Sequence, residues 1–505
     1  MTTDSEEVWT SAFVMCGLSS CDRKKIAGAE SLSVSITEES MLAKSTSAVL
    51  AGIDAIVVEI EFDIVRGLPG FAIIGLPDST IKESKDRIRS AVENSGYEFP
   101  PQNFVANLAP AFCKKQGSGF DLALALALLK STGQLTGDIH PALGELSLDG
   151  RVRPVRGALS MAIALHRAGY DKLVIPDENA EECAVVEGLE CYAVNDLREA
   201  VAAMKGGVNR YTGRNIAEEP VAYQFDFAHV YGQESVRRAM EIAAAGNHNV
   251  LMYGPPGSGK SLIAKCVPSI LPSLTREQSI ETTMIHSAGG MLNSRSGLIR
   301  VPPFRTPHHT ASDIALVGGG RIPSVGEISL AHNGVLFLDE FSEFQRTALQ
   351  TLRQPMEDFE VTISRASGIT RYPCDFMLVA ATNPCQCGYF FDSEIRCRCS
   401  PGDIARYRKT LSGPVIDRID LEVYVPRIPY EKLVNRNRSE DSASIRNRVE
   451  KTRAVQRRRF SGTGTRFNSR MSSHEVKKFC ATDEDAVNLF EQAVTRMRLS
   501  SRSLF

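Results

Sequence analysis

A glycine-rich loop that ends in Lys-Ser is the strongest chemical signal in this sequence. Residues 254–261 fit the pattern G-x-x-x-x-G-K-[ST], whose backbone N–H groups surround nucleotide phosphates. The apolar run at 249–253 predicts a buried strand before the loop, and 262–267 predicts a helix after it. The helix N-terminus adds the positive end of its dipole. The alternative is a glycine-rich turn with an incidental lysine.

The predicted nucleotide-binding residues are Gly254, Pro255, Pro256, Gly257, Ser258, Gly259, Lys260 and Ser261. Lys260 is expected to reach the β- and γ-phosphates, and the Ser261 hydroxyl to ligate Mg²⁺. A second apolar run, 334–338, ends in Asp339 and Glu340. Asp339 is expected to hold Mg²⁺ through water and Glu340 to polarise the attacking water. The alternative for the acidic pair is a helix cap.

Two further polar residues follow apolar runs downstream of the acidic pair. Asn383 ends the run 378–382, where an amide can orient the lytic water. Arg418 lies beside Asp417 and Asp420, and an arginine here can be offered to the γ-phosphate of a neighbouring subunit. The alternative is a local surface ion pair, which contributes little.

Four of the twelve cysteines are clustered. Cys385 and Cys387 form one C-x-C pair, and Cys397 and Cys399 form a second pair in the same loop. Two such pairs can supply four thiolates to one tetrahedral Zn²⁺, although C-x-C is less diagnostic than C-x-x-C. The alternative is a set of reduced thiols in an ordered loop.

The composition indicates a soluble globular protein. The chain has 505 residues, of which 23% are charged and 43% hydrophobic, so several domains are expected. No signal peptide or long apolar run occurs, which predicts a cytoplasmic protein with reduced thiols and no membrane partner. Residues 427–505 carry 18 Lys and Arg against 9 Asp and Glu. This basic region is either a nucleic-acid surface or a solvated helical face.

The pattern along the chain predicts an α/β protein of several domains. Strands are expected at 53–60, 71–75, 104–108, 173–176 and 191–194, and helices at 78–94 (with Asp78 as N-cap) and 121–129. A basic stretch at 435–448 is expected to be a loop. The predicted domains are a disordered extension at 1–40, an α+β domain at 41–204, a linker at 205–225, an ATPase domain at 226–426 and a basic helical lid at 427–505.

The order of these motifs resembles that of the AAA+ ATPases, and their amino-acid sequences resemble those of the magnesium-chelatase-like branch. Stretches that carry the likeness are 308–312, 326–334, 352–358 and 411–414. Within that branch, residues 41–505 are similar to the ComM/YifB family. The resemblance implies that Asn383 is sensor 1, Arg418 the arginine finger and Arg502 a sensor 2 that touches the γ-phosphate. Family members usually continue beyond this point, so the last lid helix is expected to be short.

The resemblance also implies a hexameric ring whose insertions face the central pore. Residues 360–371 predict a β-hairpin before sensor 1, and 287–303 form a glycine-rich excursion that carries Arg295 and Arg300. Arg365 and Arg371 are candidate DNA contacts, although a hairpin packed on its own subunit is an equal alternative.

Two segments in the first domain resemble the Lon protease domain, namely 114–121 and 144–154. Lon-type catalysis needs a Ser nucleophile and a Lys base. The match puts Gly119 at the Ser position and Leu159 at the Lys position, with Ser118 one residue away, so a non-proteolytic domain is expected.

Three functions follow from these likenesses. The ComM family is associated with branch migration of DNA in natural transformation, which implies an ATP-driven hexameric DNA motor. The runner-up is the ATPase subunit of a magnesium-insertion complex, and the third is an ATP-dependent protease. His308 and His309 are expected to be structural rather than metal ligands.

Overall fold

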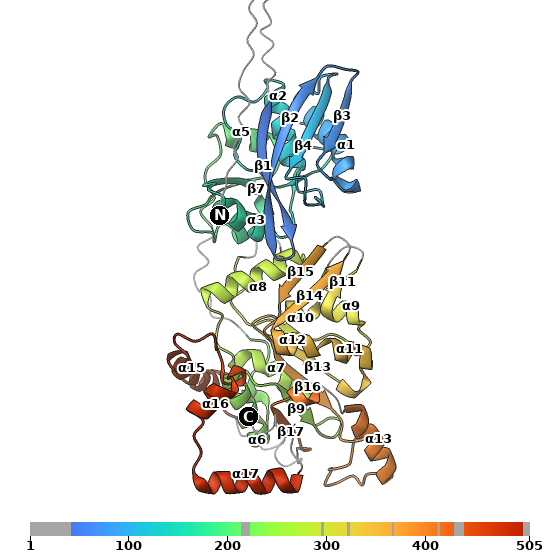
Figure 1. The fold of residues 1–505 in the computed structure, drawn as a ribbon, viewed down its shortest axis with the longest axis vertical. Coiled ribbons are helices and arrows are strands. Elements are labelled where there is room, and N and C mark those ends of the chain that lie inside the picture. Colours follow the sequence, from blue (N-terminus) through green and yellow to red (C-terminus); the bar gives the residue numbers. More distant parts are fainter. Residues whose placement is uncertain are drawn as a thin grey trace, which may run out of the picture. The chain divides into compact units, whose positions relative to one another are not determined.

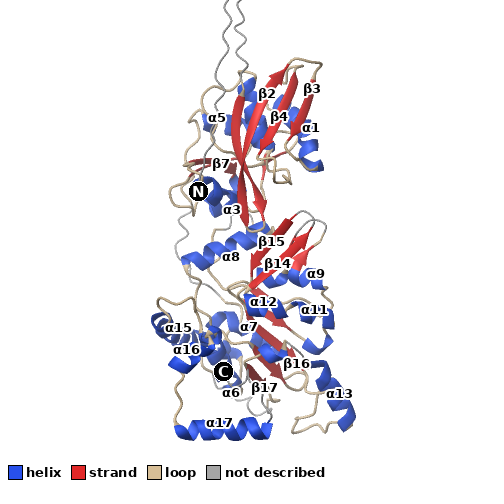
Figure 2. Ribbon diagram, viewed as in Figure 1, coloured by secondary structure: helices blue, strands red, loops and turns tan. Residues whose placement is uncertain are grey.

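Two separate β-sheets organise the chain (Figure 1). The computed structural model describes residues 42–213, 223–293, 297–320, 324–365, 368–411, 415–428 and 439–497. Figure 2 shows helices and strands intermixed along both regions, as the expected α/β class requires. The expected extension at 1–40 lies outside the described residues.

The first sheet has four strands in the order β1-β2-β4-β3. Its strands are β1 (Ala43–Ala51), β2 (Asp54–Val65), β3 (Gly70–Ile74) and β4 (Asn103–Ala109). Only the β3–β4 pair is parallel. A small parallel pair, β7 (Lys172–Pro176) and β8 (Glu190–Val194), lies further along the chain.

Helices and short strands complete this region. They are α1 (Ser79–Asn94), α2 (Asp121–Ser131), α3 (Ala158–Arg167), α4 (Ala180–Cys183), α5 (Leu197–Met204), β5 (Glu145–Leu146) and β6 (Val152–Arg153). The predicted N-cap is confirmed, because the Asp78 side chain accepts a hydrogen bond from the Ile81 N–H. Strand β1 was not predicted, since its many small and polar residues hide the apolar pattern. Its Ser47 is nevertheless buried, where the hydroxyl donates to the Ala142 carbonyl at 2.9 Å.

The second sheet is parallel, with the strand order β10-β13-β16-β9-β17. The strands are β9 (Val250–Tyr253), β10 (Phe304–Arg305), β13 (Val335–Leu338), β16 (Met377–Thr382) and β17 (Leu421–Tyr424). Alternate residues face two cores: Val335 and Val379 pack into one apolar cluster, and Leu336 and Leu378 into another. Burial on both faces explains the continuous apolar runs in the sequence.

Helices and short strands surround this sheet and continue to the end of the described chain. They are α6 (Glu234–Gly246), α7 (Lys260–Ile270), α8 (Arg276–Ala288), α9 (Asp313–Val317), α10 (Glu327–Leu330), α11 (Arg346–Thr351), α12 (Arg353–Asp358), α13 (Pro401–Leu411), α15 (Ser442–Arg459), α16 (Ser473–Phe479), α17 (Glu484–Met497), β11 (Gly318–Gly319) and β12 (Ser324–Val325).

The loop expected at 435–448 is partly wrong, because α15 begins at Ser442. Asp441 caps the helix by accepting from the Ser444 N–H, and Ile445 and Val449 are buried. The high charge of the stretch had hidden this one-sided apolar pattern. Residues 429–438 lie outside the description.

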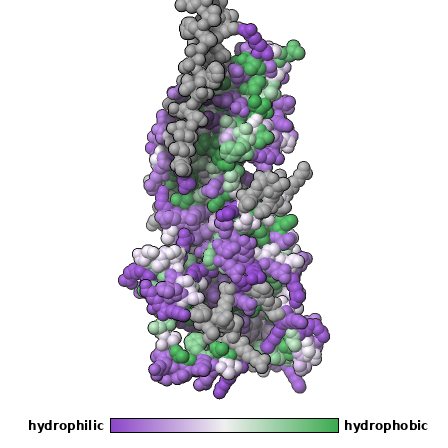
Figure 3. Space-filling model, viewed as in Figure 1, coloured by the Kyte–Doolittle hydropathy of each residue, from purple (hydrophilic) through white to green (hydrophobic). Residues whose placement is uncertain are grey.

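The predicted hairpin is present as β14 (Glu360–Arg365) paired with β15 (Gly368–Pro373). Among the described residues, no helix has both the length and the apolar character needed to cross a bilayer. Figure 3 shows a face of hydrophilic and apolar side chains, the apolar ones lying in its upper part and also at its lower edge, over α17. Val487, Leu489 and Phe490 of α17 are exposed apolar residues.

Candidate functional site

The glycine-rich loop joins β9 to α7 at the carboxyl end of the parallel sheet. Gly254 follows the strand, and a Cβ there would lie 2.1 Å from the Val425 carbonyl oxygen, so no larger residue fits. Gly259 immediately before α7 has φ of 91°, which favours glycine. The predicted strand–loop–helix arrangement is therefore confirmed, with the N-terminus of α7 open to an anion.

The Lys260 ammonium lies over the loop itself. Its Nζ donates to the carbonyl oxygens of Gly254 at 2.8 Å and Pro255 at 2.9 Å, and lies 3.5 Å from Asn383 Oδ1. Burial lowers the pKa of Lys260 to about 8. The negative charge of Asp339 acts in the opposite direction and raises this pKa. A partly desolvated cation held by neutral oxygens fits a site that receives phosphate.

Ser261 and Asp339 meet although they are far apart in the sequence. The Ser261 hydroxyl donates to Asp339 Oδ2 at 2.6 Å. Asp339 follows β13, and Ser261 lies in the first turn of α7. A hydroxyl and a carboxylate are oxygen donors of the kind that Mg²⁺ prefers, so the pair fits the expected metal.

Glu340 has a partner that the sequence analysis missed. The Glu340 backbone is left-handed, with φ of 51°. His309 Nδ1 lies 3.0 Å from Glu340 Oε2, and both side chains are partly exposed. His308 instead places its Nδ1 2.9 Å from Thr310 Oγ1. The adjacent histidines offered no sequence signal for this contact, because it depends on how the loop after β10 meets the end of β13.

Asn383 follows β16, the strand between β9 and β13, and so lies beside Lys260 as expected. A second missed group is Tyr407 of α13. Its hydroxyl bonds to Ser342 at 2.9 Å and to Thr382 at 3.1 Å. This network connects the ends of β13 and β16 to α13.

Arg418 is buried, with 6% of its side chain exposed, and forms an ion pair with Glu357 of α12. Neighbouring Asp420 instead accepts from the Asn249 N–H at 2.8 Å and lies 3.5 Å from His248 Nδ1. In this chain the Arg418 guanidinium is thus engaged by a carboxylate of α12. Arg502, the other predicted arginine, lies outside them.

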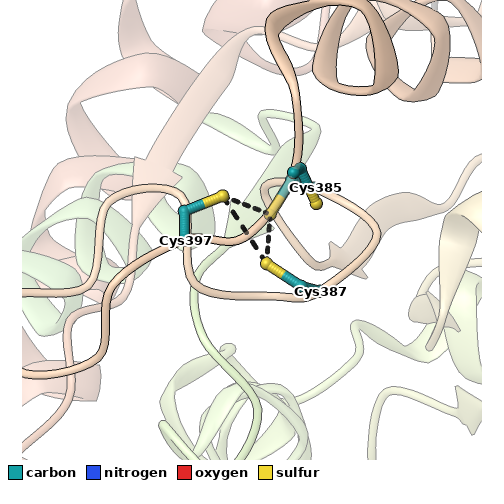
Figure 4. Close-up of side chains that lie close together, drawn as sticks. Cys385, Cys387 and Cys397 are labelled. Carbon is teal, nitrogen blue, oxygen red and sulfur yellow. Dashed lines mark hydrogen bonds between the residues drawn. The ribbon is translucent and has the colours of Figure 1, made fainter.

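The four clustered cysteines converge as predicted. Their Sγ atoms all lie within 4.8 Å of one another. The Sγ–Sγ distances are 3.4 Å for Cys385–Cys387, 3.5 Å for Cys387–Cys397 and 3.8 Å for Cys385–Cys397 (Figure 4). No other group of three metal-ligating side chains is found in the described chain.

Two of the candidate pore arginines, Arg371 and Arg300, have described side chains. Arg371 is 70% exposed and lies 3.5 Å from Glu360 across the hairpin. Arg300 is also exposed. Arg295 and the side chain of Arg365 lie outside the described residues.

Three family models match the chain, all from magnesium chelatase. "Magnesium chelatase, subunit ChlI" matches residues 226–433, "Subunit ChlI of Mg-chelatase" matches 60–179, and "Magnesium chelatase, subunit ChlI C-terminal" matches 439–505. YifB of Salmonella typhimurium is 39% identical over 466 residues, covering 90% of this chain and 88% of that protein. Competence protein ComM of Haemophilus influenzae is 38% identical over 462 residues, covering 90% and 89%.

The chain belongs to the ComM/YifB family of magnesium-chelatase-like AAA+ proteins.

Membership in the ComM/YifB family implies an ATPase that uses ATP and Mg²⁺. A weaker similarity, 27% identity over 184 residues, connects the chain with Lon protease 2 of Bacillus subtilis. At the two positions that the sequence analysis matched to the Lon pair, Leu159 is fully buried in α3, and Ser118, next to Gly119, contacts Glu145 through its hydroxyl. The nearby buried Asp121 accepts from Arg87 Nε at 2.8 Å and from the Leu146 N–H at 3.3 Å. Its charge is thus paired within the fold.

Proposed function

We propose that this chain is an ATP-hydrolysing ring motor that acts on DNA. The observation that carries the proposal is the 2.6 Å hydrogen bond between Ser261 and Asp339, beside the Lys260 ammonium. It joins the phosphate-binding loop after β9 to the acid that follows β13, two strands away in the same sheet. Such a pairing of hydroxyl, carboxylate and lysine is what phosphoryl transfer with Mg²⁺ requires.

Each residue has a separate role in the proposed reaction. The loop N–H groups and Lys260 hold the phosphates, and Ser261 and Asp339 hold Mg²⁺, which supplies positive charge when bound. Glu340 accepts a proton from the attacking water, and the Asn383 amide orients that water. For this, Glu340 has to leave His309.

We assign Arg418 to the active site of a neighbouring subunit and Arg502 to the lid. An arginine that stabilises transition-state charge can be supplied by another chain. In this chain Arg418 is paired with Glu357, so the role requires the ion pair to open on ring assembly. The exposed apolar residues of α17 support a subunit interface, because such patches are commonly buried in assemblies. We propose a homohexamer in the cytoplasm.

DNA is the proposed partner because exposed basic residues lie on two elements, α15 and the β14–β15 hairpin. Lys451, Arg457 and Arg458 of α15 are exposed, as is Arg371 of the hairpin. Branched or single-stranded DNA is the expected form, in line with the name of the Haemophilus relative, competence protein ComM.

The deciding experiment compares ATP hydrolysis by the purified full chain with and without four-way or forked DNA. We expect strong stimulation by branched DNA. Lys260→Ala should lower hydrolysis by about a hundredfold or more, since it removes the cation that meets the phosphates. Lys265→Ala is the matched control, because Lys265 is an exposed lysine of the same helix. Wild-type hydrolysis that is indifferent to DNA would contradict the DNA role.

A second candidate is the ATPase subunit of a magnesium-insertion complex. The three magnesium-chelatase family models favour it. Hydrolysis that ignores DNA but rises with porphyrin-binding partner subunits would support this candidate.

Proteolysis is a weaker candidate, because Gly119 and Leu159 cannot serve as nucleophile and base. ATP-stimulated cleavage of casein would reverse that conclusion. For the cysteine cluster we propose Zn²⁺, as argued below.

A further inference from the structure

A cysteine-bearing loop lies directly against the phosphate-binding loop. We propose that Cys385, Cys387, Cys397 and Cys399 bind one Zn²⁺, and that this ion holds the loop as a wall of the ATP site. The metal site stands by itself, whereas its effect on ATP rests on the proposed function.

The arrangement of the sulfur atoms fits a tetrahedral ion. A tetrahedron with Zn–S bonds of about 2.3 Å has S–S edges of about 3.8 Å. The Sγ–Sγ distances among Cys385, Cys387 and Cys397 are 3.4, 3.5 and 3.8 Å, close to this edge. Cys399 completes the set within the same 4.8 Å limit. Binding converts the four thiols to thiolates and releases their protons to solvent, so the bound set carries a net charge of −2.

The loop has no regular secondary structure, so side-chain contacts have to hold it, and a bound ion would join its two cysteine pairs. The stretch from Asn383 to Ser400 is fully described and contains no helix or strand. Loops of this length inside a compact domain are uncommon unless they are functional. Only Cys385 of the four ligands is fully buried, so no apolar core surrounds the site. One ion that joins the two C-x-C pairs replaces that missing core.

Gly388, next to Cys387, touches the phosphate-binding loop. A Cβ at Gly388 would lie only 2.8 Å from Pro256 Cδ, and the residue has φ of 87°. The cysteine loop therefore approaches Pro256 as closely as the chain allows. Any shift of Cys387 moves the surface against which the phosphate-binding loop rests.

Phe391 makes a second contact from the segment between the two cysteine pairs. Its ring centroid lies 6.1 Å from that of Tyr253, which immediately precedes Gly254. Tyr424 also packs on Phe391 at 5.8 Å, and its hydroxyl donates to the Phe391 carbonyl at 2.8 Å. Asn383, at the start of the same loop, lies beside Lys260. The ion thus sits in the middle of a loop that contacts the ATP site at three points.

Metal content tests the site directly. The full chain, purified without chelators, should contain about one zinc per chain by elemental mass spectrometry. Cys387→Ser and Cys397→Ser should each lose it. Cys480→Ser, which replaces an exposed cysteine outside the cluster, should retain it. Wild-type protein without zinc, or with iron in its place, would overturn the proposal, and so would a Cys387→Ser, Cys397→Ser double variant that still binds zinc.

A glycine variant tests the coupling without touching a ligand. Gly388→Ala should keep its zinc, yet bind a fluorescent ATP analogue about tenfold more weakly or hydrolyse ATP about tenfold more slowly. Gly462→Ala is the matched control, since it has the same left-handed backbone, with φ of 80°, and nothing within 4 Å of its Cβ. Equal nucleotide binding and hydrolysis by both variants would overturn the coupling.

The two proposals fail in different ways. Zinc bound by a wild-type protein that never hydrolyses ATP would contradict the motor and leave the metal site standing. Lys260-dependent hydrolysis by a wild-type protein that binds no zinc would contradict the metal site and leave the motor standing.

Discussion

At the scale of single residues, the site is defined by partners from distant parts of the chain. Glu340 combines a left-handed backbone with a contact to His309, and such strain at a functional position is commonly retained for a reason. The contact occupies the carboxylate that is proposed to act on water. We therefore propose that His309 holds Glu340 in a resting position.

Removing His309 should raise ATP hydrolysis in the absence of DNA. The pair is partly exposed, so its opening costs at most about 1 kcal/mol, and His309→Ala should accelerate basal turnover up to about fivefold. Steady-state hydrolysis without DNA measures this. His308→Ala should have little effect, because His308 bonds to Thr310. A slower His309→Ala enzyme would mean that the histidine instead positions Glu340 for catalysis.

Lys260 should make ATP binding dependent on pH. Its pKa is lowered to about 8 by burial, and bound phosphates favour the charged lysine and raise that value again. Above about pH 8, binding must therefore take up a proton, and affinity should fall as the pH rises. Titration calorimetry in buffers of different ionisation enthalpy measures the proton uptake. Lys260→Arg should show none, because arginine stays charged.

At the scale of elements, parallel pairing brings the chemistry together. β9, β13 and β16 end at the same edge of the sheet, where the phosphate-binding loop follows β9, Asp339 follows β13 and Asn383 follows β16. The β14–β15 hairpin precedes β16 in the chain and pairs Thr362 with Arg371. Its exposed charge is available to a partner outside the sheet.

Arg371 is predicted to contact a DNA phosphate. Arg371→Ala should weaken DNA binding at every sequence and lower the slope of log affinity against log salt by about 1. Fluorescence anisotropy over a salt series measures both. Arg406→Ala is the control, because Arg406 is an equally exposed arginine that pairs with Asp403 at 3.2 Å. An unchanged salt slope in Arg371→Ala would mean that Arg371 of the hairpin does not contact DNA.

At the scale of the whole molecule, the proposed ring needs residues from two chains at each active site. Arg418 is buried against Glu357 in the single chain, while Lys260 and the Ser261–Asp339 pair lie at the end of the parallel sheet. Assembly is therefore expected to complete the site.

Mixed rings test this division of roles. Lys260→Ala and Arg418→Ala proteins should each be nearly inactive, and mixing them should restore a fraction of hydrolysis. In such rings an intact Arg418 faces an intact Lys260 of the next chain. Circular dichroism checks that Arg418→Ala is folded, since it leaves Glu357 without its cation. If both variants are folded and mixing restores no hydrolysis, Arg418 would instead act in the active site of its own chain.

The sequence by itself determined the local features of this protein. The phosphate-binding loop, the acidic pair, the Asp78 cap, the β14–β15 hairpin and the apolar strands follow from short-range spacing, because glycine conformation and apolar periodicity act within a few residues. Strand β1 and the start of α15 were missed, since small polar residues and dense charge hide the buried face. Only the tertiary structure decided which distant groups meet. It brought His309 to Glu340, Tyr407 to Ser342, Arg418 to Glu357 and Gly388 to Pro256, because these contacts depend on how whole strands and loops pack.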